Sequence, residues 1–193
     1  MKNPMLRSGL ALAGAQSWLD GKELPAGFED GVLTAQDVAM IDLRATEMVV
    51  LSACDTGLGE VLQGEGVFGL RRAFVVAGAK TLVMSLWRVH DLAAVLLMDK
   101  FYENLLEQKM ARSEALREAQ RYLRRDVTIG SLRKEWLNEE MIERLTGSNS
   151  KARVKMEEWR DSSDDLRPFR DVFYWGAFIL HGEAGPLEWD RPN

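Results

Sequence analysis

The residues best suited to chemistry in this 193-residue sequence are its single cysteine, Cys54, and its two histidines, His90 and His181. Cys54 follows an apolar, partly β-branched run over residues 48–53, and a glycine-rich stretch over residues 57–66 comes after it. Catalytic groups in open α/β sheets gather at the carboxyl ends of strands, and exposed backbone N–H groups there favour a thiolate. The pattern therefore predicts either a nucleophilic thiol or a small buried hydrophobe, which is the commoner role of a free cysteine.

The glycine-rich stretch departs from the phosphate-binding motifs. The glycines at 57 and 59 are not followed by one at 62, so the dinucleotide fingerprint is incomplete. Glu65 and Gly66 stand where a P-loop needs a lysine and a hydroxyl residue. One cysteine also excludes a disulfide framework within the chain, and two histidines argue against a metal cage. We expect no cofactor and no metal.

The net charge and the hydropathy limit the kinds of partner that this chain can have. The net charge of −5, from 30 acidic and 25 basic side chains, argues against a general nucleic-acid binder. No run reaches the roughly 18–20 apolar residues that a membrane helix needs. The first 15 residues imitate a short signal peptide, but a buried strand over Gly9–Ala13 is the better interpretation. The expectation is a cytoplasmic protein with no nucleic-acid or membrane partner.

The elements that must position these residues follow from periodicity and punctuation. A loop is expected over about 17–31, followed by a short helix that a Thr34–Asp37 capping box begins and that ends near Met40. Strands are expected at 48–53, 81–87 and 172–180, and helices at about 67–77, at 92–107 with Asp91 as cap, and at 114–124 with Ser113 as cap. This alternation predicts an α/β fold with a mostly parallel sheet.

The stretch from about 126 to 171 is polar and broken. We expect it to form a polar surface excursion of short helices, tethered by Trp136 and Trp159. The whole chain, residues 1–193, is expected to form a single domain, of which this stretch is a part.

The run VVLSACDTGLGEVLQGEGVFGLRRAFVVAGAKTLVMSLWRV, at residues 49–89, resembles the core of the CHAT family of caspase-like proteins. Members of this family are often fused to tetratricopeptide repeats. The flanking pieces LRSGLALAGA, DGVLTAQDVAMIDLRATE and YWGAFILHGE agree with the resemblance. It implies a caspase-like α/β fold over nearly the whole chain, of which this sequence would be the C-terminal portion, lacking the first strands.

The resemblance also implies site roles. Cys54 matches the nucleophile of cysteine peptidases, its backbone N–H would serve the oxyanion hole, and Asp55 matches the polar residue beside it. The family's general base is a histidine in a THG-like motif upstream of LRSGLALAGA, which this sequence does not contain. His90 follows the strand at 81–87 and is the candidate substitute base; its other interpretation is a solvent-facing loop residue. His181 is expected to be a surface residue at a strand end.

Two functions remain open. The first is a CHAT-type cysteine peptidase domain that is truncated before its histidine and inactive alone. Its partners would be a protein or peptide substrate and the missing N-terminal half or a tetratricopeptide-repeat region. The second is a non-catalytic interaction module that keeps the peptidase fold. The reactivity of the Cys54 thiol discriminates between them.

Overall fold

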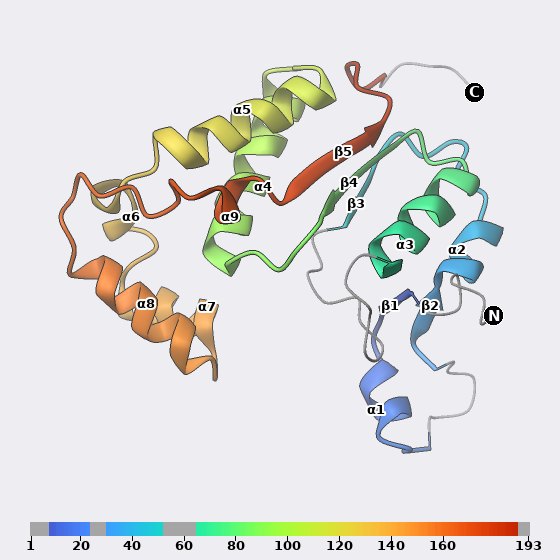
Figure 1. Ribbon diagram of the computed structural model, residues 1–193, viewed down its shortest axis with the longest axis horizontal. Helices are drawn as coiled ribbons and strands as arrows, with labels where there is room; N and C mark the ends of the chain where they lie inside the picture. The colour runs from blue at the N-terminus through green and yellow to red at the C-terminus, as the bar shows by residue number, and fades with distance from the viewer. Residues whose placement is uncertain (1–7, 24–29, 52–64, 189–193) are drawn as a thin grey trace. The chain divides into compact units, whose positions relative to one another are not determined.

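The computed structural model describes residues 8–23, 30–51 and 65–188. Its contacts divide the chain into two compact units, Met1–Leu86 with His181–Glu183, and Trp87–Leu180 with Ala184–Asn193. Both contain helices and strands or strand segments, in agreement with the expected α/β class (Figure 1). Among the described residues, none of the helices is long and apolar enough to cross a membrane.

The first unit opens with a two-stranded antiparallel sheet. β1 (Gly9–Ala11) pairs with β2 (Val32–Thr34), and α1 (Ala15–Leu19) lies between them in the chain. The predicted strand at Gly9–Ala13 is therefore shorter than expected, and it is not buried throughout, because Ala11 is exposed. Its partner β2 was not predicted, since three half-buried residues carry too little alternation to be recognised.

The capping box at Thr34 is confirmed. Thr34 Oγ1 accepts a hydrogen bond from the Asp37 backbone N–H at 3.2 Å, and Asp37 Oδ2 accepts one from the Thr34 N–H at 2.9 Å. These two bonds satisfy backbone donors that would otherwise lack partners at the start of α2 (Ala35–Met40). α2 packs against α3 (Glu65–Val76), as Figure 1 shows.

A parallel pair of strands forms the centre of this unit. β3 (Val49–Leu51) and β4 (Thr81–Ser85) pair in parallel with Val49 opposite Leu82, as the predicted sheet requires. All five residues of β4 are buried. β3 was expected to be buried on both faces, but all of its residues are only half-buried. β5 (Phe178–Gly182) contributes His181 and Gly182 to this unit.

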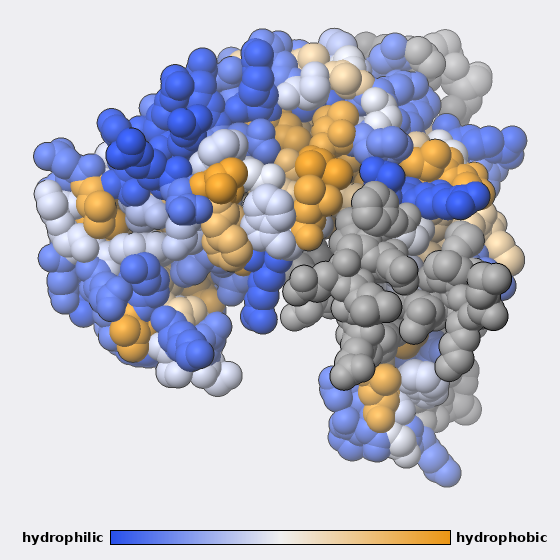
Figure 2. Space-filling model, in the orientation of Figure 1, coloured by the Kyte–Doolittle hydropathy of each residue, from blue (hydrophilic) through white to orange (hydrophobic). Residues whose placement is uncertain are grey.

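The second unit is built on a helix pair. α4 (Asp91–Tyr102) continues into a π-helical segment, Glu103–Glu107, and packs along α5 (Arg112–Arg125). Their apolar faces supply much of the core, including Leu92, Leu97, Phe101, Ala115, Ala119 and Leu123. The outer face of α5 is strongly hydrophilic in Figure 2.

Two predicted caps are wrong. His90, not Asp91, is the N-cap of α4, and its side chain makes no capping hydrogen bond. α5 begins at Arg112, so Ser113 lies inside its first turn. The Ser113 hydroxyl donates to the carbonyl oxygen of Ala184 at 3.3 Å instead, and the Ser113 and Arg112 N–H groups bond to the same C-terminal segment. A tertiary contact therefore satisfies the donors that a local cap would have served.

The polar stretch at 126–171 contains three short helices, as predicted. They are α6 (Ile129–Arg133), α7 (Glu139–Thr146) and α8 (Ser150–Arg160), and α7 and α8 lie side by side (Figure 1). The expected tether Trp159 is only 4% exposed. The same stretch also buries Ile129, Leu132, Leu137, Ile142, Met156 and Phe169. These short helices therefore carry part of the hydrophobic core of the second unit.

The predicted strand at 172–180 is wrong in its first half. Val172–Trp175 forms a helical turn, α9, and the strand begins only at Phe178. The Asp171 side chain accepts a hydrogen bond from the Phe173 N–H at 2.8 Å, which caps this turn. The Trp87 indole N–H donates a hydrogen bond to the Phe173 carbonyl oxygen at 2.9 Å. This bond ties the helical turn to another part of the unit.

Candidate functional site

Cys54 and Asp55, the predicted nucleophile and its neighbour, lie outside the described residues. The structure does describe the strand before them. β3 ends at Leu51 and is parallel to β4, so both strands direct their carboxyl ends toward the same edge of the sheet. That edge is where α/β proteins carry their catalytic residues. The strand that the sequence predicted ahead of Cys54 is thus present with the predicted direction.

His90 is described, and it is not a solvent-facing loop residue. It takes an extended backbone conformation at the N-terminus of α4. Its ring centroid lies 5.1 Å from that of Trp159 and 6.3 Å from that of Tyr174. Both ring nitrogens are shielded from solvent, and neither has a hydrogen-bond partner within the described ranges. The solvent-facing interpretation fails because Trp159 and Tyr174, distant in sequence, pack against the imidazole.

The surroundings of His90 keep its imidazole neutral at pH 7. Burial is the main cause that lowers the His90 pKa below its ordinary value of 6.5, because the charged ring would lose its hydration. The carboxylate of Asp91 acts in the opposite direction, and the ammonium of Lys155 adds to the lowering. A neutral imidazole has one N–H donor and one nitrogen acceptor, and it is the form that can take up a proton.

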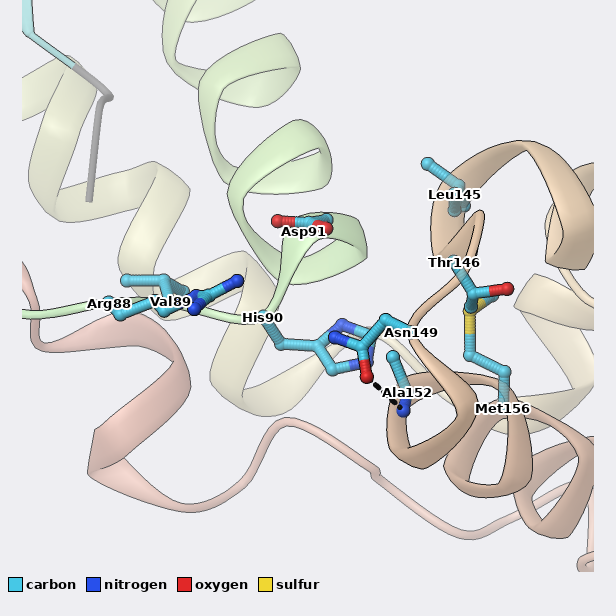
Figure 3. A pocket seen from close by; sticks show the side chains of 9 residues that line it. All are labelled: Arg88, Val89, His90, Asp91, Leu145, Thr146, Asn149, Ala152 and Met156. Atoms are coloured by element: carbon cyan, nitrogen blue, oxygen red, sulfur yellow. Dashed lines mark hydrogen bonds between the residues drawn. The ribbon is translucent and has the colours of Figure 1, made fainter. Parts of the chain in front are cut away.

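His90 also lines a pocket of about 70 Å³ in the second unit (Figure 3). One wall is the segment at 88–91; the other is formed by Leu145, Thr146, Asn149, Ala152 and Met156, from α7, α8 and the turn between them. The Thr146 hydroxyl donates to the Ile142 carbonyl oxygen at 2.7 Å, and Asn149 Oδ1 accepts from the Ala152 N–H at 3.1 Å.

Sequence reasoning found His90 but missed the opposite wall of this pocket. Asn149 carried the one available signal, because an asparagine before a helix is a typical N-cap. Thr146 and Met156 carried no such sequence signal, since they line the pocket only because of how α7 and α8 pack in the second unit.

His181 lies in β5 and is exposed, as predicted for a surface residue at a strand end. Among the residues that the structure describes, no group of three or more histidine, cysteine, aspartate or glutamate side chains could hold a metal ion. Of the three predicted catalytic residues, Cys54, Asp55 and His90, the structure thus describes only His90.

Comparison with known proteins adds the family context. A family model for the CHAT domain matches residues 1–183. Tetratricopeptide repeat protein 28 of Mus musculus is 38% identical over 76 residues, which are 39% of this chain and 3% of that protein. The Homo sapiens protein of the same name is 39% identical over 88 residues, 46% of this chain and 3% of that protein. The chain therefore matches only about 3% of the length of these curated relatives. No solved structure matches.

Proposed function

This chain belongs to the CHAT domain family, a caspase-like, peptidase-related family, and we propose that it supplies the nucleophile side of a cysteine peptidase site, with Cys54 as the nucleophile. The observation that supports this most is the family match across residues 1–183, which includes β3 and the SACDTG run that follows it. Asp55 is the acidic neighbour of the nucleophile in this proposal.

The proposed chemistry is acyl transfer. The Cys54 thiolate attacks the peptide carbonyl carbon, the C–N bond breaks, and the amine leaves with a proton from the general base. Water then hydrolyses the thioester and restores the thiol. The backbone N–H of Cys54 donates to the developing oxyanion.

The general base is the catalytic group that this 193-residue chain supplies least clearly. Neither of its histidines lies in a THG-like motif. His90 is the substitute base in this proposal, and its neutral imidazole suits that role. Its ring, however, packs against Trp159 and Tyr174 and presents no exposed nitrogen. We therefore expect the chain on its own to have little or no peptidase activity, and a histidine-bearing segment from a longer or second chain to complete the site.

The partners follow from the same proposal. The substrate is a protein or peptide, and a tetratricopeptide-repeat region is the proposed companion, since the relatives carry tetratricopeptide repeat in their names. A cytoplasmic, reducing location suits a single functional thiol.

The pH dependence of alkylation tests the nucleophile. Cys54 is the only thiol, so the rate of its reaction with iodoacetamide reports that residue alone. We expect the rate to rise with a midpoint below about 8.5, the value of a free thiol. The same chain in urea is the matched control. A midpoint at or above the urea value contradicts a poised thiolate.

Complementation tests the peptidase. A separately produced CHAT segment that carries the THG-like motif is added, and cleavage of a peptide library is measured with intact chain and with Cys54→Ala. Cleavage is expected only with the intact chain. Cleavage that survives Cys54→Ala rules out the proposed mechanism, and cleavage that persists in folded His90→Phe excludes His90 as the base.

A second candidate is a non-catalytic interaction module. The packing of His90 against two aromatic rings favours it, because an active base needs a nitrogen that reaches the substrate or the thiol. A free-thiol alkylation profile together with no cleavage after complementation is the result that this candidate predicts.

A further inference from the structure

The contact between the segment at 88–91 and the helices α7 and α8, which we call the His90 seam, has two features that weaken it (Figure 3). The first is the imidazole, whose two nitrogens are buried without a hydrogen-bond partner in the described part of the chain. A buried polar group in that state costs free energy, because it has lost its hydrogen bonds to water. The second is the pocket of about 70 Å³ between the two walls, which lack the close packing of a protein interior there. Both features lower the free energy needed to open the seam.

The two helices that form one wall of the seam are joined to each other. Glu139, at the start of α7, pairs with Arg153 and, at 3.3 Å, with Arg160, both on α8. α7 packs mainly against α8, and we call the pair, residues 139–160, the α7–α8 hairpin. Few of its side chains are in the core; its buried residues are Ile142, Thr146, Met156 and Trp159. Opening the seam therefore uncovers a small apolar surface, and the hairpin keeps its own contacts as it moves.

The closed seam disfavours the charged form of His90. The groups around the ring are Arg88 ahead of α4, Asp91 on α4, Lys155 on α8, Tyr174 on α9, and Leu145 and Thr146 on α7. Burial is the main cause that lowers the His90 pKa; the ammonium of Lys155 adds to the lowering, and the carboxylate of Asp91 opposes it. His90 also stands at the N-terminus of α4, where the helix dipole repels a cation. A proton therefore binds His90 more tightly when the seam is open and the ring is hydrated.

We propose that the α7–α8 hairpin is a lid over His90 that is closed while the imidazole is neutral and that opens when the imidazole takes up a proton. In the opened form the ring is in water, where a histidine has a pKa of about 6.5. The ratio of opened to closed chains therefore rises as the pH falls through 6.5, by up to about tenfold between pH 7.5 and pH 5.5. Opening exposes Met156 and Trp159 together with the ring, so acidity controls access to this surface. The lid uses neither Cys54 nor Asp55 and does not depend on the peptidase proposal.

Thiol labelling tests the lid on the full 193-residue chain. In a Cys54→Ala background, Met156→Cys places the only thiol inside the seam, where Met156 is 0% exposed. Val154→Cys on the same helix is the matched control, because Val154 is 54% exposed. Each variant reacts with dithiodipyridine at pH 7.5, 6.5 and 5.5, and the ratio of the Met156→Cys rate to the Val154→Cys rate removes the effect of pH on the thiol itself. We expect this ratio to rise by up to about tenfold as the pH falls. A ratio that stays constant or falls overturns the proposal.

A second substitution identifies the histidine that is responsible. His90→Phe, added to Met156→Cys and Val154→Cys alike, is expected to abolish the rise in the labelling ratio, because phenylalanine takes up no proton. His181→Phe is expected to leave the rise unchanged, since His181 is exposed and lies in the first unit. Circular dichroism checks that each variant folds. A rise that survives in folded His90→Phe assigns the pH dependence to another group and overturns the proposal.

A third thiol separates opening of the lid from unfolding of the helix pair beneath it. Ala119 lies in α5 and is 0% exposed, so Ala119→Cys in the same background reacts only when that core unfolds. Met156→Cys is expected to react about tenfold faster than Ala119→Cys or more, because a local opening costs less free energy than unfolding of the core. Equal rates mean that Met156→Cys reacts only through unfolding of the core, and they overturn the lid. Ala152→Cys, in the pocket wall, repeats each measurement if Met156→Cys does not fold.

Discussion

The imidazole of His90 lies against Trp159 and Tyr174, and its two nitrogens lack partners in the part of the chain that the structure describes. Burial lowers its folded-state pKa, while the unfolded chain has a pKa of about 6.5. As the pH falls through 6.5, the unfolded chain takes up a proton that the folded chain still excludes. The His90 contribution to stability is therefore present above pH 6.5 and is lost as the pH falls below it.

The direction of this pH dependence of stability gives the first prediction. The free energy of unfolding in urea is expected to fall between pH 7.5 and pH 5.5, with a slope that approaches about 1.4 kcal/mol per pH unit below pH 6.5. His90→Phe is expected to remove this part of the pH dependence, and His181→Phe is expected to keep it. An unchanged pH dependence in His90→Phe contradicts the prediction.

Gly182 is a residue whose backbone requires glycine. Its φ is 101°, and a Cβ there would meet the backbone carbonyl oxygen of Lys80. Gly182→Ala is therefore expected to destabilise the protein by about 1–3 kcal/mol through strain and steric overlap. Gly185→Ala is the matched control, because a Cβ at Gly185 would meet no described atom within 4 Å and its φ is not positive. Thermal unfolding of both variants measures the difference, and equal melting temperatures refute it.

At the scale of elements, α2 depends on local capping. Thr34 and Asp37 exchange two hydrogen bonds at its first turn. Thr34→Ala is expected to cost about 1 kcal/mol of stability, and Thr34→Ser, which keeps the hydroxyl, only a few tenths. Urea unfolding measures both. If the two variants lose equal stability, the hydroxyl is not the source of the effect.

The same element shows how far sequence reasoning reaches. The capping box of α2 was predictable because both partners lie within four residues of each other, and β4 because its run of mostly apolar residues is buried along its whole length. α9 was not predictable, since an aromatic, β-like run became helical through the Asp171 cap and the Trp87–Phe173 hydrogen bond. The predicted cap of α5 failed for a similar reason, because distant backbone groups replaced a local side chain.

The candidate site, too, could be predicted from the sequence only in part. His90 could be selected from the sequence by its type and by its place after β4. The sequence could not predict that the ring nitrogens of His90 lack hydrogen-bond partners in the described chain. That feature depends on Trp159, Tyr174 and the packing of α8. The nucleophile assignment of Cys54 rests on the family, and β3 supports it only through its direction.

At the scale of the whole molecule, the contacts form two compact units, whereas the sequence predicted a single domain over residues 1–193. β5 is divided between the units, because Phe178–Leu180 belong to the second and His181 and Gly182 to the first. Whether the units unfold together is an energetic question that a mutation in one core can answer. Ile142 in α7 is fully buried in the second unit.

Ile142→Ala is expected to destabilise the second unit by about 2–5 kcal/mol, because it leaves a cavity. If the units open separately, amide hydrogen exchange will accelerate in α6, α7 and α8 while the amides of β4 keep their protection. Ala73→Gly in α3 is the reciprocal variant, since Ala73 is fully buried in the first unit. Equal acceleration in both units by either variant means that they unfold as one cooperative domain, and that the single-domain prediction holds energetically.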